Sequence, residues 1–267
     1  MFPLFTKTFP DSPDQLAELL RATLRRLFIL QGDPVAVRAF KFPRIEELAI
    51  TLDGAQVRPD PPRPVFAQRE GSEALDVQRF SMSGKAIELA GGRVNLRLDA
   101  DAVRFKAGTA PDGDIVLVLG AAENGRLEAS VGRRDLETVI AELAKGEAAK
   151  QGVAVESVAL NVKQHGARSI AAEVRLRARK LFLSATLQID GELDIDERFN
   201  ATISGLKCTG SGALGTLACG VLGPHLERLN QRSFSLLALP LGEIQIREIQ
   251  LTAGETIAVN ASFQSVA

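Results

Sequence analysis

The stretch VAVESVALNV, residues 153–162, decides how this chain of 267 residues folds. Its apolar side chains follow the spacing apolar-x-apolar-x-x-apolar-x-apolar, with one extra residue between Val155 and Val158. Successive side chains of a strand point to opposite faces, so a β-bulge must take up that residue if the apolar groups are to share one face. Because bulges bend strands, the spacing predicts a bent sheet with one apolar face.

The same unit occurs three times, as a Leu-rich helical stretch followed by a strand with the bulged spacing. The helix before residues 153–162 carries its apolar side chains at helical spacing, at Leu136, Val139, Ile140 and Leu143. The other two strands place theirs at Ile45, Leu48, Ile50 and Leu52, and at Ile244, Ile246, Ile249 and Leu251. A bent antiparallel sheet with a helix in its concave face would enclose an apolar trough.

The chain divides into two halves that we expect to form one continuous unit. Residues 1–130 predict an N-terminal helix, capped by Ser12, and an antiparallel meander with turns at Gly91-Gly92, Asp112-Gly113 and Asn124-Gly125. Residues 131–267 predict a helix, four strands, a second helix and two strands. The predicted fold class is α+β, with a highly curved antiparallel β-sheet wrapped around long amphipathic helices.

Charge and composition limit the partners. The formal net charge is −1 and the chain has 13 Phe but no Trp or Tyr, so bulk charge does not recruit nucleic acid, and a ligand would contact aliphatic surface. No stretch predicts a membrane span or a secretory signal. As numbered, the chain is expected to be cytoplasmic, or periplasmic or membrane-associated if a leader was removed.

The two cysteines and a glycine motif favour structural roles. Two thiols in a chain of this size are more often reduced and buried, so we expect Cys208 and Cys219 to be free, with a disulfide as the alternative. The motif Gly210-x-Gly212-x-x-Gly215 matches a dinucleotide fingerprint in its letters only, because the strand before it alternates as in a meander. We expect these glycines to let a helix begin close to a sheet.

Catalytic signals are weak. The two histidines are His165 and His225, and neither they nor the cysteines have the spacing of a zinc site. A grouping of Ser211, His225 and a carboxylate has no support from spacing. The sequence therefore predicts no enzyme activity, no catalytic residue, no metal and no cofactor.

The residues expected to line the trough are aliphatic and come from two helices and one strand. They are Leu136, Val139, Ile140, Leu143, Leu181, Leu183, Leu187, Ile189, Leu214, Leu217, Val221 and Leu222. Arg175, Arg177 and Arg179 alternate with apolar residues, which predicts a solvated face; the second hypothesis is contact with phosphate headgroups at the rim of the trough.

Four stretches carry a resemblance to a known family. They are GRLEASVGRRDLETVIAEL at residues 125–143, VESVALNV at 155–162, LQIDGELDI at 187–195, and SLLALPLGEIQIREIQLTAGETIAVNA at 235–261. Together they resemble the LmeA-like phospholipid-binding family, a bacterial branch of the tubular lipid-binding (TULIP) proteins. The resemblance implies a long helix in a highly curved sheet and a lengthwise apolar channel for acyl chains.

The leading hypothesis is a non-enzymatic protein that binds or transfers phospholipid or another acyl lipid, with peripheral membrane contact. The alternative is a structural interaction domain with a filled core, whose Phe-rich N-terminus (Phe2, Phe5 and Phe9) recruits a partner protein. A weaker alternative is a lipid-directed hydrolase that uses Ser211 and His225.

Overall fold

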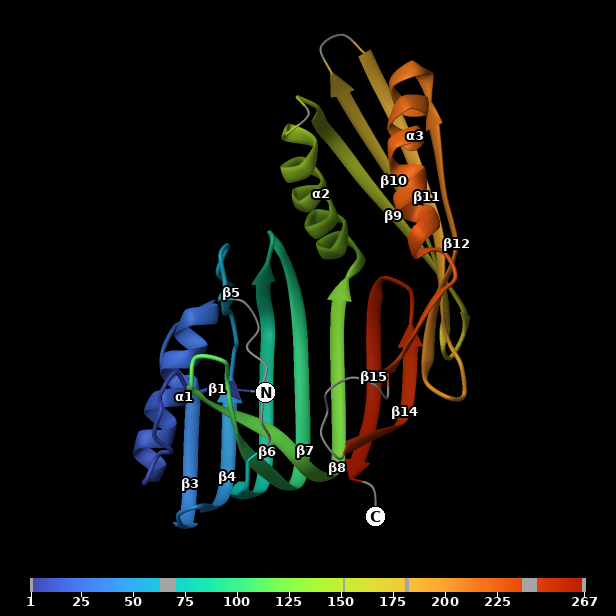
Figure 1. The fold of residues 1–267 in the computed structure, drawn as a ribbon. Coiled ribbons are helices and arrows are strands. Elements are labelled where there is room, and N and C mark those ends of the chain that lie inside the picture. Colours follow the sequence, from blue (N-terminus) through green and yellow to red (C-terminus); the bar gives the residue numbers. More distant parts are fainter. Residues whose placement is uncertain (1, 63–70, 151, 181–182, 237–243, 266–267) are drawn as a thin grey trace.

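Two β-sheets and three helices make up the described part of the chain (Figure 1). The computed structural model describes residues 2–62, 71–150, 152–180, 183–236 and 244–265. The helices are α1 (Pro13–Leu27), α2 (Arg133–Ala149) and α3 (Gly212–Leu229). Each lies where the sequence predicts a helix, and the α+β class is confirmed.

The first sheet has ten strands and contains both ends of the chain. Its main path runs β14-β15-β8-β7-β6-β4-β3, and β4 and β5 pair with β6 in parallel while the other pairs are antiparallel. The strands are β1 (Phe2–Pro3), β2 (Phe28–Ile29), β3 (Val35–Lys41), β4 (Arg44–Thr51), β5 (Gln56–Val57), β6 (Glu73–Leu89), β7 (Gly92–Thr109), β8 (Ile115–Gly132), β14 (Ile244–Thr252) and β15 (Thr256–Ser265).

The second sheet has five antiparallel strands in the order β13-β12-β11-β10-β9. They are β9 (Ala154–Gly166), β10 (Ser169–Lys180), β11 (Leu183–Ile195), β12 (Asn200–Ser211) and β13 (Arg232–Ser235). After this sheet the chain returns to the first one, where β15 pairs with β8. The two predicted halves, residues 1–130 and 131–267, therefore both contribute strands to the first sheet.

The predicted bulges are present in all three repeats. The register between β9 and β10 shifts where Ser157 and Val155 face Arg177 and Ala178, so Glu156 is the extra residue. An equivalent register shift lies between Ile246 and Glu248 of β14. A third lies between Arg38 and Ala39 of β3, where Glu46 of β4 is the extra residue. The shifts keep the apolar side chains in phase with one face of each sheet.

One predicted turn is wrong. The Asn124-Gly125 pair does not end a strand, because β8 runs through it from Ile115 to Gly132. Asn124 has a φ of 47° in a stretch where the β7–β8 register shifts, so the pair accommodates a bulge. A Cβ on Gly125 would lie 2.1 Å from the ring of Phe263, so the glycine makes room for that ring.

The tight turn predicted at Gly91-Gly92 is present, but it lies one residue earlier in the sequence. Leu89 pairs with Gly92, and the two residues between them, Ala90 and Gly91, both have positive φ. This is the geometry that suits the twist of a hairpin.

The largest core lies between α1 and the first sheet. Ser12 caps α1 by accepting a hydrogen bond from the Gln15 amide, as predicted. Leu16, Leu20 and Leu24 of α1 are buried in one cluster with strand residues such as Ile45 and Val77. The helix ends at Leu27, because the next residues, Phe28 and Ile29, pair with β5.

Helix α2 begins against the β6–β7 hairpin. A Cβ on Gly92 would lie 2.4 Å from the Asp135 carbonyl oxygen and 2.6 Å from Cγ2 of Val139. The Asp135 carboxylate accepts a hydrogen bond of 3.0 Å from the Arg93 amide. The first sheet therefore positions α2 by close backbone contact.

Substitution of Gly92 by Ala should displace α2 and lower the free energy of unfolding by about 1–3 kcal/mol, because a methyl group has no room beside the helix backbone. Chemical denaturation measures this change. The control is Gly146→Ala in α2, where nothing lies within 4 Å of the added Cβ, and it should stabilise by up to about 1 kcal/mol. Equal stability of the Gly92→Ala variant and the wild type would contradict the close contact.

Candidate functional site

One face of the second sheet is apolar across four neighbouring strands. Directly paired residues share a face, and two adjacent rows run across the sheet. The rows are Val158, Leu176, Leu187 and Gly210, and then Leu160, Val174, Ile189 and Cys208. The alternate residues on the other face include Arg175, Gln188 and Thr209. The sheet is therefore one-sided, as the bulged spacing predicts.

Helices α2 and α3 cover this apolar face over different strands. Helix α2 packs against β9, and α3 packs against β12 and β11, so β10 lies between the covered strands (Figure 1). Leu160 on the apolar face of β9 is only 6% exposed, whereas Ala159 and Asn161 on the other face are exposed. The Glu137 carboxylate of α2 accepts a hydrogen bond of 2.8 Å from the Leu160 amide, a contact that the sequence did not suggest.

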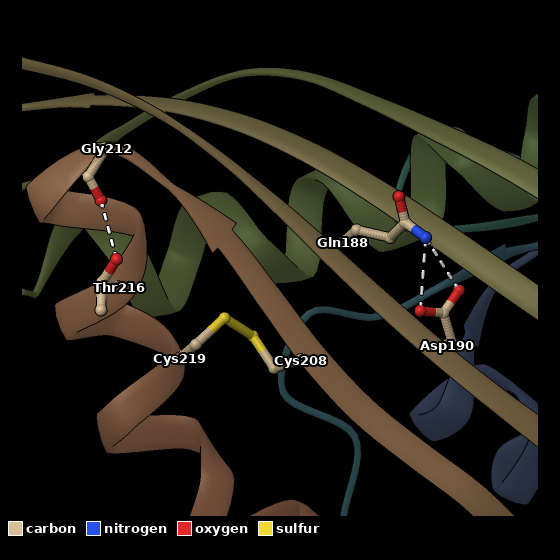
Figure 2. Close-up of a disulfide and its surroundings, with 6 residues drawn as sticks. All are labelled: Gln188, Asp190, Cys208, Gly212, Thr216 and Cys219. Carbon is tan, nitrogen blue, oxygen red and sulfur yellow. Dashed lines mark hydrogen bonds between the residues drawn. A yellow bond between two sulfur atoms is a disulfide. The ribbon is translucent and has the colours of Figure 1, made fainter.

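A disulfide holds α3 on the same face. Figure 2 shows Cys219 of α3 joined to Cys208 of β12, and their Cα atoms are 5.5 Å apart. The expectation of two free thiols is therefore wrong. The bond forms because the helix turns back directly over the strand that precedes it, which places the second turn of α3 beside β12.

Glycines allow this close return. A Cβ on Gly210 would lie 2.2 Å from the Gly215 carbonyl oxygen, and Gly212 has a φ of 74°. The predicted structural role of the Gly210-x-Gly212-x-x-Gly215 motif, to start a helix close to a sheet, is confirmed.

The predicted lining residues of α3 are split between two faces of the helix. Because Cys219 faces the sheet, residues two positions before and after it point away from the sheet. These are Leu217 and Val221, which are 70% and 71% exposed, so the structure does not bring them to the strands. Leu222 is half-buried, and the side chain of Leu214 lies outside the described part of the chain.

The predicted lining residues of α2 differ in how far they are buried. Val139 is buried over Gly92, and Leu136 and Ile140 are half-buried. Leu143 is 63% exposed, one turn beyond the hairpin that covers Val139. This helix therefore carries an aliphatic side chain that no described residue buries.

Of the predicted strand residues, Leu187 is buried and Ile189 is half-buried. Leu181 and the side chain of Leu183 lie outside the described residues. Three half-buried residues on the same face, Val158, Val174 and Leu176, were missed, although their alternation with polar residues could have identified them. We call Val158, Val174, Leu176 and Ile189 the open strip: they are adjacent across β9, β10 and β11 and are incompletely covered.

The apolar faces of the two sheets meet at a junction cluster. Its buried members are Ile195 and Ala201 of the second sheet and Ile249 and Leu251 of the first. The Leu251 amide donates a hydrogen bond of 2.7 Å to the Ala167 carbonyl, and Gln164 donates one of 3.1 Å to the Leu251 carbonyl. Partly buried residues of both sheets pack on this cluster, including Ile170 and Leu193 of the second sheet and Val259 and Ala261 of the first.

The predicted arginine stripe lies on the opposite face of the second sheet. Arg175, Arg177 and Arg179 are exposed, and they alternate with Val174, Leu176 and Ala178 on β10. Arg175 forms an ion pair of 2.5 Å with Glu173, and Arg179 one of 3.4 Å with Glu156. This position agrees with a solvated face, and contact with headgroups stays a prediction.

The grouping suggested for hydrolysis is not assembled. Ser211 is the N-cap of α3 and His225 lies far along that helix, so a rise of about 1.5 Å per residue places them roughly 20 Å apart. Proton transfer between two side chains requires hydrogen-bond contact.

Two further observations concern metals and membranes. Within the described residues, no group of three or more His, Cys, Asp or Glu side chains could hold a metal ion. The helices of that same part of the chain fall short of the length and apolar character that a membrane crossing needs.

Replacement of Cys208 and Cys219 by Ser should loosen α3 and lower the free energy of unfolding by about 2–4 kcal/mol. Hydrogen exchange should become faster in α3, while α1 keeps its protection. A reducing agent should reproduce this effect in the wild type and leave the double variant unchanged. Unaltered exchange of α3 after reduction would show that the disulfide does not hold the helix.

Comparison with family models, curated proteins and solved structures finds no match for this chain. The function is therefore argued from its own residues.

Proposed function

We propose that this protein binds an acyl-chain lipid, such as a phospholipid or a fatty acid, along the open strip. One observation carries the proposal: the four aliphatic side chains of the open strip lie next to one another across β9, β10 and β11, stay partly exposed, and lie between the strands that α2 and α3 cover. A folded protein that leaves a contiguous apolar surface uncovered commonly uses it to bind a partner or ligand.

The chemistry of the strip favours hydrocarbon. Val158, Val174, Leu176 and Ile189 are all aliphatic. Each methylene that such a surface takes out of water contributes about 0.8 kcal/mol, so a long acyl chain could be held without a charged anchor. Selectivity among headgroups would then be weak.

The proposal includes the finer architecture that the resemblance implies. The three bulges support a highly curved sheet wrapped around the helices, as in the LmeA-like branch of the TULIP proteins. Transport of lipid by a bacterial protein is the part of the proposal that rests on the resemblance alone. The disulfide supports an oxidising compartment, such as the periplasm, over the cytoplasm.

A second candidate function, an interaction domain for a protein partner, is favoured by Leu217 and Val221 on the outer face of α3. The N-terminal rings give it less support, because Phe2 packs edge-on against Phe80 and Phe9 packs against Phe42. Association of the protein with itself at higher concentration, without any lipid uptake, would favour this function.

Substitution of Leu176 by Gln should weaken binding of a fluorescent fatty acid by about tenfold, because a polar amide buried against an acyl chain lacks a hydrogen-bond partner. The matched control is Arg177→Gln, which changes the next residue of β10 on the opposite face and should leave the affinity unchanged. Titration of delipidated protein measures both. The proposal fails if the wild type takes up no fatty acid and native mass spectrometry finds no phospholipid adduct.

Loss of affinity in the Arg177→Gln variant alone would instead place the ligand on the polar face of the sheet. Circular dichroism of both variants checks that the fold is intact.

A further inference from the structure

The end of β3, next to its turn into β4, exposes an aromatic ring at the edge of the first sheet. Phe40 is 71% exposed, whereas its neighbour Phe42 packs against Phe9 with ring centroids 6.3 Å apart. Burial of Phe42 anchors the turn to the core and leaves Phe40 in water. We call residues 40–44 the β3–β4 tip.

A hollow lies at the base of this tip. It has a volume of about 560 Å³ and is lined by Phe40, Lys41, Phe42, Pro43, Arg44, Ile45, Asp76 and Gln78. Four of these eight residues are apolar and the other four are polar or charged, so the exposed ring borders a hollow of mixed character.

The charges around the tip leave an excess of cations. Arg38 pairs with Glu46 at 3.3 Å and with Glu47 at 2.5 Å, and Arg79 pairs with Glu46 at 3.6 Å. These four groups compensate one another.

Lys41 and Arg44 are exposed and form no ion pair within the described part of the chain. Asp76 is the acidic residue that lines the hollow. Two cations at the tip therefore face one carboxylate, although the whole chain carries a net charge of −1.

We propose that the β3–β4 tip docks on the surface of an anionic phospholipid bilayer. The Phe40 ring enters the acyl region, and Lys41 and Arg44 contact headgroup phosphates. An apolar side chain flanked by cations matches the two layers of such a surface, since insertion and electrostatic attraction add to each other.

A bilayer fits this site better than a second copy of the chain. Strand β3 is the edge of its sheet, and strand-to-strand pairing is the main way in which edges recruit copies. The exposed side chains of Arg38 and Lys41 on that edge oppose such pairing. Phe40 lies where the β3–β4 register shifts, between Ala39 and Lys41, and a bulge also disfavours regular pairing at this end of the edge.

This docking goes beyond acyl-chain binding and rests on different residues. The two proposals can therefore fail separately. A tip variant that loses vesicle binding should still take up a soluble fluorescent fatty acid.

Co-sedimentation with vesicles tests the docking. The full chain should sediment with phosphatidylcholine vesicles that contain phosphatidylglycerol, much less with pure phosphatidylcholine, and less as salt is added. Phe40→Ala, and the double variant Lys41→Gln with Arg44→Gln, should each weaken this partition by roughly tenfold.

Matched controls are available on the second sheet. Phe234→Ala removes another exposed ring, and Lys163→Gln with Lys207→Gln removes two exposed cations; neither should change the partition. Equal losses in the controls and the tip variants would overturn the proposal, as would unchanged binding of the tip variants. Dimerisation that depends on Phe40, without vesicle binding, would overturn it in favour of a second copy.

Discussion

The structure depends on the need to cover sheets that are apolar on one face only. Alternation places polar residues such as Arg175 and Gln188 on the outer face of the second sheet and aliphatic ones such as Leu187 on the inner face. A helix shields a band of limited width, and α2 and α3 lie over β9 and over β11 and β12. The helices leave Val174 and Leu176 of the open strip partly exposed. The candidate site therefore arises from the same constraint that drives folding.

The junction cluster makes the two sheets one structure. Ile195 packs with Ile249 and Leu251 across the boundary between them, and a backbone hydrogen bond from Leu251 to Ala167 in the β9–β10 turn reinforces the contact. Helix α2 adds a second link, because its N-terminal turn rests on the β6–β7 hairpin while Glu137 bonds to β9. Two separate contacts therefore determine how the apolar face of one sheet continues into the other.

Local patterns predicted what depends on neighbouring residues. The bulge at Glu156, the cap at Ser12 and the close return at Gly210 follow from spacing, hydrogen bonding and size within a few positions. The turn predicted at Asn124-Gly125 is wrong because β8 continues through this pair, and Gly125 pairs with Phe263, which is distant in the sequence. The prediction of two free thiols is wrong for a similar reason. It rested on how often cysteines are reduced in chains of this size, which does not show that α3 folds back over β12. Helical periodicity alone could not tell which side of α3 meets the sheet, so Leu217 and Val221 were assigned to the site.

The two helices that flank the open strip are held in different ways. Helix α2 contacts both sheets, and its position is fixed by the backbone contact at Gly92 and the hydrogen bond of Glu137. Helix α3 contacts the second sheet, where the disulfide and the approach of Gly210 to Gly215 hold its first turns, while Leu217 and Val221 add no burial. Because the disulfide ties α3 to β12, reduction of the cysteines should act on the β11 and β12 side of the strip. The position of α2 depends on its contact with the first sheet at Gly92. Substitutions at Gly92 and at the cysteines should therefore affect different sides of the open strip.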